Sequence, residues 1–234
     1  MSNGALVCGF GDVSAGLGGL AWDLGEPGAV VLSDGRAQPG TFALEEGGDD
    51  AALAITAEGI TIEATLSART SEIALEGGPV ATACVAEVRS AGATQTFECS
   101  GQICRWAENP LEGNGTFRQI AVETGEDSLL IVVGRGRAGG PHGEEETGGW
   151  QIQGEDTAAF EESLLSTQYD GAGDPTRIGL ELWPPEADQT SRAAATRVSG
   201  SLLAGARGGD TWAGFFRCHT GGSEGIGTYL HRRA

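Results

Sequence analysis

Short stretches of alternating apolar and polar residues, separated by glycine-containing turns, recur along most of this chain. The stretch Arg177-Ile-Gly-Leu-Glu-Leu-Trp183 shows the pattern clearly, with aliphatic side chains at every second position. A period of two residues places one set of side chains on each face of a β-strand. The 40 glycines among 234 residues also suit many turns between short strands. The pattern therefore predicts an all-β protein.

Segments with this pattern occur in both halves of the chain. In the first half we predict strands over residues 28–32, 40–44, 51–57, 60–69, 81–89 and 95–106. In the second half we predict them over 117–122, 129–133, 149–153, 163–169 and 178–183. A C-terminal hairpin of 212–219 and 225–231 is expected to turn at Thr220-Gly-Gly-Ser-Glu224.

One short helix is expected over residues 156–165, because Asp156 is a good N-cap and Glu161 and Glu162 follow it. No other long segment keeps a helical period, so we expect at most one or two short helices. Residues 109–115 are a plausible connector, which divides the chain into an N-terminal β lobe (1–108) and a C-terminal β lobe (109–234). Residues 85–97 and 215–226 have a similar strand–turn–strand pattern, and suggest that the two lobes are related repeats.

The formal net charge of −19 argues against nucleic acid and anionic membranes as partners, since both repel a polyanion. All 14 basic residues are arginines. The lack of lysine excludes a P-loop, a pyridoxal-phosphate Schiff base, a lysine aldolase and a Ser-x-x-Lys nucleophile.

The chain is expected to be cytoplasmic, because its start has no secretory signal pattern and no window approaches ~18 apolar residues. The five cysteines are odd in number and scattered, so we expect them to be reduced: Cys8, Cys84, Cys99, Cys104 and Cys218. Their spacing fits no zinc site. We expect no metal and no cofactor, and an exposed strand edge would permit a homodimer.

Two motifs match catalytic patterns but lack the structural context these need. Gly134-Arg-Gly-Arg-Ala-Gly139 resembles a dinucleotide-binding loop, yet the glycine- and proline-rich segment that follows would break the required helix. Gly221-Gly-Ser-Glu-Gly225 resembles a nucleophile elbow. That motif needs a helix after it and then an acid and a histidine further along the chain, whereas the few residues that follow here have the pattern of a strand. We interpret both as turns of β-hairpins.

The second half resembles a known family over roughly residues 117–233. The resemblance is carried by Gly140-Pro-His-Gly-Glu144, Leu165-Ser-Thr-Gln-Tyr-Asp170, the Arg177–Trp183 stretch and Phe215-Phe-Arg-Cys-His-Thr-Gly-Gly-Ser-Glu-Gly-Ile-Gly-Thr-Tyr229. The family is the lipocalin-like one that includes carotenoid 1,2-hydratases (hydroxyneurosporene synthases) and related uncharacterised bacterial proteins. The resemblance implies two lipocalin-like antiparallel β-barrel or sandwich lobes whose interior or interface binds an apolar molecule. Some similar folds catalyse cyclisations, including Diels–Alder reactions, in natural-product pathways, whereas this chain is short for a carotenoid hydratase.

The residues suggest two kinds of chemistry in such a pocket. Alkene hydration or cationic cyclisation needs a protonated carboxylic acid near aromatic rings, for which Glu181 beside Trp183 and Asp170 beside Tyr169 are candidates. A pericyclic reaction needs a shaped apolar pocket and one or two hydrogen-bond donors to a carbonyl. Candidate donors and lining residues are Tyr169, Tyr229, Trp183, Arg217, His219, Trp212, Phe216 and His142.

Simpler interpretations stay open for two of these residues. Glu181 can pair with Arg177 on an exposed strand face, and His142 can lie in a solvated acidic loop. We expect a cofactor-free enzyme of secondary metabolism that cyclises or hydrates a terpenoid- or polyketide-like substrate. The alternative is a non-catalytic carrier of a small apolar ligand.

Overall fold

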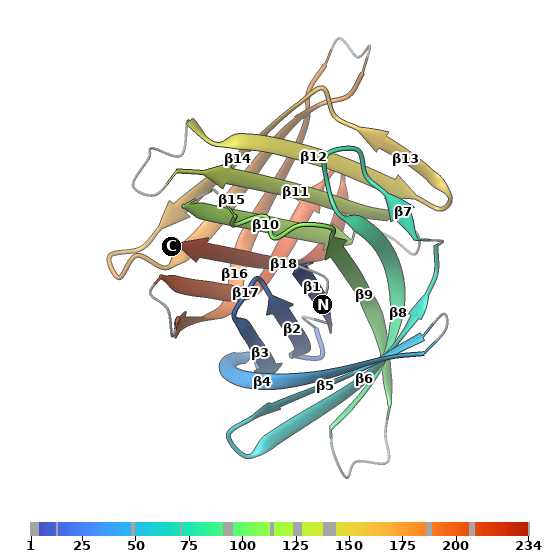
Figure 1. The fold of residues 1–234 in the computed structure, drawn as a ribbon, viewed down its shortest axis with the longest axis vertical. Helices are drawn as coiled ribbons and strands as arrows, with labels where there is room; N and C mark the ends of the chain where they lie inside the picture. The colour runs from blue at the N-terminus through green and yellow to red at the C-terminus, as the bar shows by residue number, and fades with distance from the viewer. Residues whose placement is uncertain are drawn as a thin grey trace.

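The computed structural model describes residues 5–12, 14–47, 50–70, 72–90, 96–112, 115–123, 128–137, 144–185, 189–205 and 209–233. Within them the chain forms eighteen strands in two antiparallel sheets, as Figure 1 shows. The all-β fold predicted from the sequence is confirmed. The described residues contain no helix that is long and apolar enough to cross a membrane.

The first sheet, which we call the first lobe, contains half of the strands. They are β1 (Ala5–Asp12), β2 (Leu17–Asp23), β3 (Pro27–Ser33), β4 (Arg36–Gly47), β5 (Asp50–Ala57), β6 (Ile60–Ala68), β7 (Ile73–Ala74), β8 (Val80–Ser90) and β9 (Phe97–Trp106). Their order is β6-β5-β4-β3-β2-β1-β9-β8-β7, and β6 also pairs with β8. Eight strands therefore close into a barrel, and β7 adds to β8 outside the ring.

The second sheet, which we call the second lobe, follows the same plan but leaves one gap. Its strands are β10 (Thr116–Glu123), β11 (Ser128–Gly136), β12 (Glu146–Gln153), β13 (Asp156–Ala159), β14 (Glu162–Tyr169), β15 (Pro175–Trp183), β16 (Ser191–Ala204), β17 (Asp210–Thr220) and β18 (Ser223–Arg233). Their order is β13-β12-β11-β10-β18-β17-β16-β15-β14. In each lobe the first strand pairs with the last. This shared order agrees with a duplication, and the boundary at residues 108 and 109 stays a prediction.

The predicted helix over residues 156–165 is wrong. The segment forms β13 and the start of β14, joined by a short bend. Ser163 and Leu165 are buried while their neighbours are exposed, so this segment has the two-residue period of a strand. Pairing with β12 and β15 outweighs the capping signal of Asp156.

The C-terminal hairpin is confirmed, with a tighter turn than expected. Thr220 pairs with Ser223, and Gly221 and Gly222 both have positive φ angles, of 55° and 87°. Two left-handed residues make the type of turn that matches the twist of a β-hairpin, and glycine adopts it without strain. Ser223 is an exposed strand residue, which excludes the nucleophile-elbow geometry.

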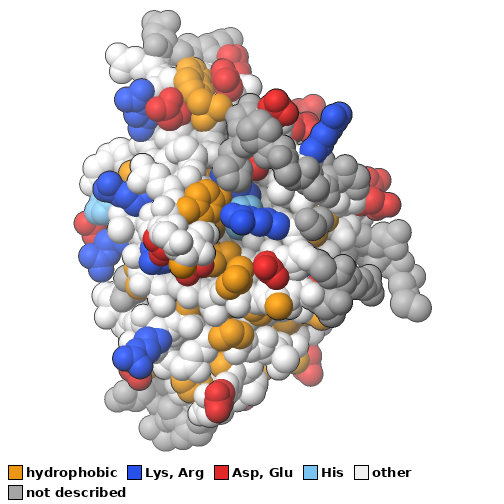
Figure 2. Space-filling model, turned by 90° about the vertical axis from the view of Figure 1, so that its left-hand side faces the viewer, with side chains coloured by type: hydrophobic (Ala, Val, Ile, Leu, Met, Phe, Trp, Pro, Cys, Tyr) orange, Lys and Arg blue, Asp and Glu red, His pale blue; other side chains and the backbone are white. Residues whose placement is uncertain are grey.

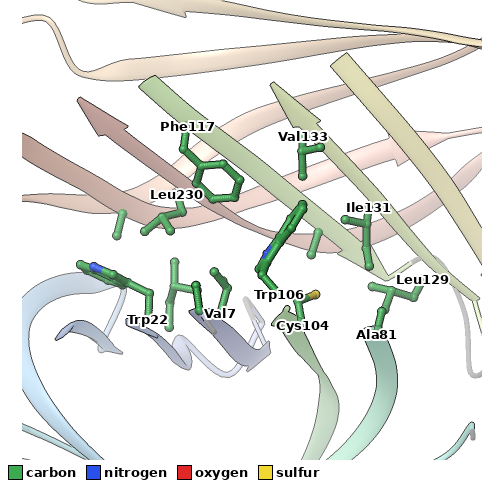
Figure 3. Close-up of a cluster of buried hydrophobic side chains, with 14 of the residues drawn as sticks. Val7, Trp22, Ala81, Cys104, Trp106, Phe117, Leu129, Ile131, Val133 and Leu230 are labelled. Carbon is green, nitrogen blue, oxygen red and sulfur yellow. The ribbon is translucent and has the colours of Figure 1, made fainter. Parts of the chain in front are cut away.

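The two lobes share one hydrophobic core, seen in Figure 3. Trp22 and Trp106 from the first lobe meet Phe117 and Leu230 from the second, and each of these side chains is buried. The rings of Trp106 and Phe117 pack edge to face, with centroids 5.7 Å apart. Burial of aromatic and aliphatic surface on this scale holds the two barrels together as one body.

Polar contacts cross the same junction. Gln102 Nε2 donates to Thr228 Oγ1 at 2.6 Å, and Glu26 pairs with Arg232 at 2.8 Å. Gly9 makes room for the first of these bonds, because a Cβ atom there would lie 2.9 Å from both partners. The contacts fix the register of one lobe on the other.

We predict that Phe117→Ala lowers the free energy of unfolding by about 3–5 kcal/mol, the usual cost of truncating a buried phenylalanine. Because the core is shared, urea unfolding followed by tryptophan fluorescence should show one transition for both lobes. Phe97→Ala, at a position 41% exposed, is the control and should change little. A second transition that Phe117→Ala leaves unshifted would contradict the shared-core interpretation.

The junction also contains a carboxyl group with a perturbed pKa. Burial raises the pKa of Glu123, at the end of β10, from 4.5 to about 8, although a hydrogen bond from Ser100 and the charge of Arg69 lower it. A raised pKa means that the folded state holds a proton which the unfolded chain has released. The contribution to stability is full below pH 4.5 and is lost as the pH rises to about 8.

Glu123→Gln, which mimics the protonated acid, should therefore gain stability relative to the natural protein between pH 4.5 and pH 8. The difference grows by at most about 1.4 kcal/mol per pH unit. Urea titrations at a series of pH values measure it. Glu87→Gln, at an exposed position on β8, is the matched control, and an equal slope for both variants would refute the assignment.

Candidate functional site

A buried cation lies inside the second lobe. The side chain of Arg118, on β10, is fully buried on the same strand face as Ile120 and Val122, which belong to the hydrophobic core of this lobe. Its guanidinium pairs with the carboxylate of Glu145, which is itself only 3% exposed. A charge in such surroundings is tolerated only when it is paired and hydrogen-bonded.

Further hydrogen bonds complete the surroundings of Arg118. Its Nη1 donates to Thr167 Oγ1 at 2.9 Å, and its Nη2 donates to the carbonyl oxygen of Leu165 at 2.9 Å. Thr167 Oγ1 lies 3.1 Å from the hydroxyl oxygen of Tyr229. Arg118, Thr167 and Tyr229 therefore form a continuous chain of hydrogen-bonding groups. We call these three residues and Glu145 the Arg118 network.

Two glycines make the ion pair possible. A Cβ atom at Gly134 would lie 2.9 Å from Glu145 Oε2, and one at Gly136 would lie 2.8 Å from Glu145 Cγ. Both glycines are in β11, opposite Arg118 and Thr116. The interpretation of Gly134-Arg-Gly136 as part of a hairpin turn is wrong, because these residues belong to β11. The missing side chains of its two glycines instead let a carboxylate reach the barrel interior.

Aromatic side chains surround Tyr229. Its ring centroid lies 5.7 Å from Phe216, 6.1 Å from Trp212 and 6.3 Å from His231. Tyr169 lies 6.2 Å from His231 and is covered by the guanidinium of Arg233 at 5.6 Å. The structure thus brings together four of the residues proposed from the sequence: Tyr169, Trp212, Phe216 and Tyr229.

Burial sets the protonation states of this network. It raises the pKa of Tyr229 well above its ordinary value, although Arg118 and the hydrogen bond with Thr167 lower it. Burial alone lowers the pKa of Arg118, but Tyr229 and Glu145 raise it above the usual range. At neutral pH the site therefore contains a neutral phenol next to a cationic guanidinium.

The second sheet is not closed by backbone pairing between its two ends, among the residues that the structure describes. We call the line where β12 and β14 lie side by side the seam. Beside it, the amide of Phe160 extends the β12–β13 pairing by donating to the carbonyl of Gly149 at 3.0 Å. Across it, Thr147 Oγ1 of β12 donates to the carbonyl of Ser163 of β14. Gly149 permits this approach, because a Cβ atom there would lie 2.3 Å from Ser163 Oγ. The hydroxyl of Ser163 and the indole nitrogen of Trp212 are buried, and neither has a hydrogen-bond partner in the described parts of the chain.

Other residues proposed from the sequence lie on the outside of the same lobe. Glu181 is half exposed and its Oε1 lies 3.5 Å from Arg192 on the neighbouring strand. Together with His219 it lines a shallow groove of about 490 Å³. Trp183 shares the outer face of β15 with Glu181, and Arg217 is exposed on β17. On the face drawn in Figure 2, hydrophobic side chains form small groups between charged ones.

Asp170 is at the end of β14 and pairs with Arg197 at 3.1 Å. Hydrogen bonds from the backbone amides of Asp174 and Ala172, and the pairing with Arg197, lower its pKa below the usual value. It is therefore ionised at neutral pH, unlike the protonated acid that a hydratase or cationic cyclase would need. His142 lies outside the described residues.

The sequence-based candidates did not include Arg118, Glu145 and Thr167. Arg118 lies within the strand predicted over residues 117–122, but no face and no role were assigned to its side chain. Glu145 belongs to an acidic run, which suggested a solvated loop. The sequence did contain one indication of the position of Arg118. This residue is two and four residues before Ile120 and Val122, and every second residue of a strand lies on the same face.

The described residues place no group of three or more histidine, cysteine, aspartate or glutamate side chains so as to hold a metal ion. The five cysteines are free. Burial raises the pKa of Cys8, Cys84, Cys104 and Cys218 to about 12, so these thiols are neutral at physiological pH.

The fold recurs in solved structures of low sequence identity. One is a proposed AttH protein from Nitrosomonas europaea, with a TM-score of 0.68, 11% identity, and coverage of 98% of this chain and 91% of that chain. Another is kievitone hydratase from Nectria haematococca, with a TM-score of 0.66, 9% identity, and coverage of 100% and 89%. A third is CghA with Sch210972, with a TM-score of 0.56, 9% identity, and coverage of 99% and 89%.

No protein-family model and no curated protein matches the chain. The similarity to the solved structures extends over both lobes, so the two-lobed lipocalin-like fold expected from the sequence resemblance is confirmed.

We predict that Arg118→Met lowers the free energy of unfolding by about 3–5 kcal/mol, because it leaves Glu145 as an unpaired buried charge. The double variant Arg118→Met/Glu145→Leu should recover most of this loss, since it removes both charges. Arg89→Met breaks an ion pair whose side chains are 57% and 42% exposed, and should cost about 0–1 kcal/mol. Urea unfolding measures all three, and equal effects of Arg89→Met and Arg118→Met would disprove the buried-pair assignment.

Proposed function

We propose that the protein is a cofactor-free enzyme that binds an apolar small molecule in the second lobe and hydrates or cyclises it. The observation that carries the proposal is the Arg118 network, a cation and a neutral phenol inside an otherwise apolar and aromatic barrel. Strongly perturbed ionisable groups in an apolar interior are typical of functional sites. Structural neighbours whose names are those of a hydratase and of CghA add support at the level of the fold.

The two reactions share one chemical requirement, which the Arg118 network meets. Water addition to an alkene that is conjugated to a carbonyl group develops negative charge on the carbonyl oxygen. A cyclisation of such a substrate is accelerated when a hydrogen-bond donor withdraws electrons through the same carbonyl oxygen. Thr167 Oγ1 accepts from Arg118 and can donate its own proton to Tyr229, which leaves the phenol O–H for the substrate. The nearby guanidinium strengthens that donor through the chain of hydrogen bonds.

Tyr229 is therefore assigned as the donor to the substrate, and Arg118 and Thr167 position and polarise it. The rings of Trp212 and Phe216 supply an apolar wall for the substrate. The seam between β12 and β14 is the proposed access route, because opening it breaks few hydrogen bonds instead of a complete ladder. The roles suggested for Glu181, His219 and Asp170 stay predictions.

The first experiment is native mass spectrometry of protein purified from its own source, with identification of any co-purifying compound. That compound and kievitone are then incubated with the enzyme and followed by liquid chromatography–mass spectrometry. A hydratase gives a product heavier by one water, and a cyclase gives an isomer of unchanged mass.

Tyr229→Phe should reduce the rate of product formation by roughly 10²–10³-fold, the usual cost of removing one such donor, while the compound still binds. Glu162→Gln, at an exposed position on β14 of the same lobe, is the matched control and should stay within about twofold. Binding without turnover that tolerates Tyr229→Phe would instead identify a carrier, the alternative function. Full turnover by Tyr229→Phe would refute the assigned donor.

A further inference from the structure

A cavity lies in the first lobe, far along the chain from the Arg118 network. It has a volume of about 360 Å³ and is at the end of the barrel where the β4–β5 hairpin turns. That volume is within the range of about 300–1,000 Å³ that small-molecule sites occupy, and barrel mouths are common places for them. Its lining residues are Glu46, Asp50, Ala51, Ala68, Thr70, Glu72, Thr82, Cys84, Ile103 and Arg105.

The rim of this cavity carries more negative than positive charge. Glu46, Asp50 and Glu72 contribute three carboxylates, against the single guanidinium of Arg105. Arg105 Nη2 lies 2.6 Å from Glu46, and its Nη1 lies 3.0 Å from Glu72. The guanidinium is therefore already occupied by two carboxylates, and no ion pair of Asp50 is found within the described part of the chain.

The inner wall combines apolar surface with one unpartnered hydroxyl. Ala51, Cys84 and Ile103 are buried and face the barrel interior. Thr82 pairs with Ile103 in the β8–β9 ladder and is only 4% exposed, and its Oγ1 has no hydrogen-bond partner among the residues that the structure describes. Buried hydroxyl groups normally have a partner, so this oxygen is a candidate acceptor for a molecule in the cavity.

We propose that the barrel mouth of the first lobe binds a small organic ammonium ion with a short alkyl chain. The net negative rim favours a cation, and the Thr82 hydroxyl accepts an N–H hydrogen bond. Ala51, Ala68 and Ile103 provide contact surface for the alkyl chain. An anion is disfavoured, because Asp50 repels it and Arg105 is engaged on both sides.

Three probes of nearly equal size separate the alternatives: n-butylammonium, 1-butanol and butyrate. Each is titrated into the full chain, and the amide signals of Thr82, Cys84 and Ile103 are followed by two-dimensional NMR. Saturable shifts with n-butylammonium, at least tenfold tighter than with the other two probes, are expected. Equal or tighter binding of butyrate or 1-butanol, or no saturable shift with n-butylammonium, would overturn the proposal.

Variants test the two residues that carry the argument. Thr82→Val preserves side-chain shape and Asp50→Asn removes one rim charge, and each should weaken n-butylammonium binding at least about fivefold. Thr65→Val on the exposed face of β6 and Glu58→Gln at the other end of β5 are the matched controls. Binding that survives both test variants would also overturn the proposal.

This site does not depend on the function proposed for the second lobe. Tyr229→Phe should leave n-butylammonium binding unchanged, and Thr82→Val should leave Tyr229-dependent turnover unchanged. The failure of either proposal is therefore visible without the other.

Discussion

The two barrels pack wall against wall, and this constraint shapes the strands that meet there. β1, β2, β3, β10 and β11 are buried on nearly all positions of both faces, because one face lines a barrel and the other lines the shared core. On β10, Phe117 points into the shared core while Arg118 points into the second lobe. Figure 3 shows Phe117 among core side chains of both lobes. This packing therefore also fixes the position of the neighbouring Arg118.

The Arg118 network has a cost that its surroundings must offset. Transfer of a guanidinium and a carboxylate out of water is unfavourable by several kcal/mol per ion, and a buried pair recovers this only with good geometry and further hydrogen bonds. Thr167 and the carbonyl of Leu165 supply such bonds to Arg118, while its Nε has no partner within the described residues. An apolar pair of similar volume is often as favourable for stability or more so, and this comparison is one reason for proposing a chemical role for these residues.

The sequence predicted strands of both kinds: β15, which has one solvent face, and β3, β10 and β11, which are buried on both faces and stand out as short apolar runs. β15 alternates because its outer face meets solvent, and it was found. β1 and β2 were missed, because both of their faces are buried and glycines interrupt their apolar runs. Arg118 was not singled out, although it lies within the strand predicted over residues 117–122. Glu145 was hidden because its position depends on the absence of side chains on β11, a neighbour in space that local pattern does not reveal.

Gly134 leaves room for the Glu145 carboxylate because it has no side chain. The arrangement of charge inside the second lobe therefore depends on this glycine. A methyl group at that position would lie 2.9 Å from Glu145 Oε2, so the carboxylate would have to shift relative to Arg118. The geometry of the buried ion pair is therefore sensitive to a residue that has no side chain. A substitution at Gly134 would alter the electrostatic surroundings of Tyr229 while every residue of the Arg118 network stays the same.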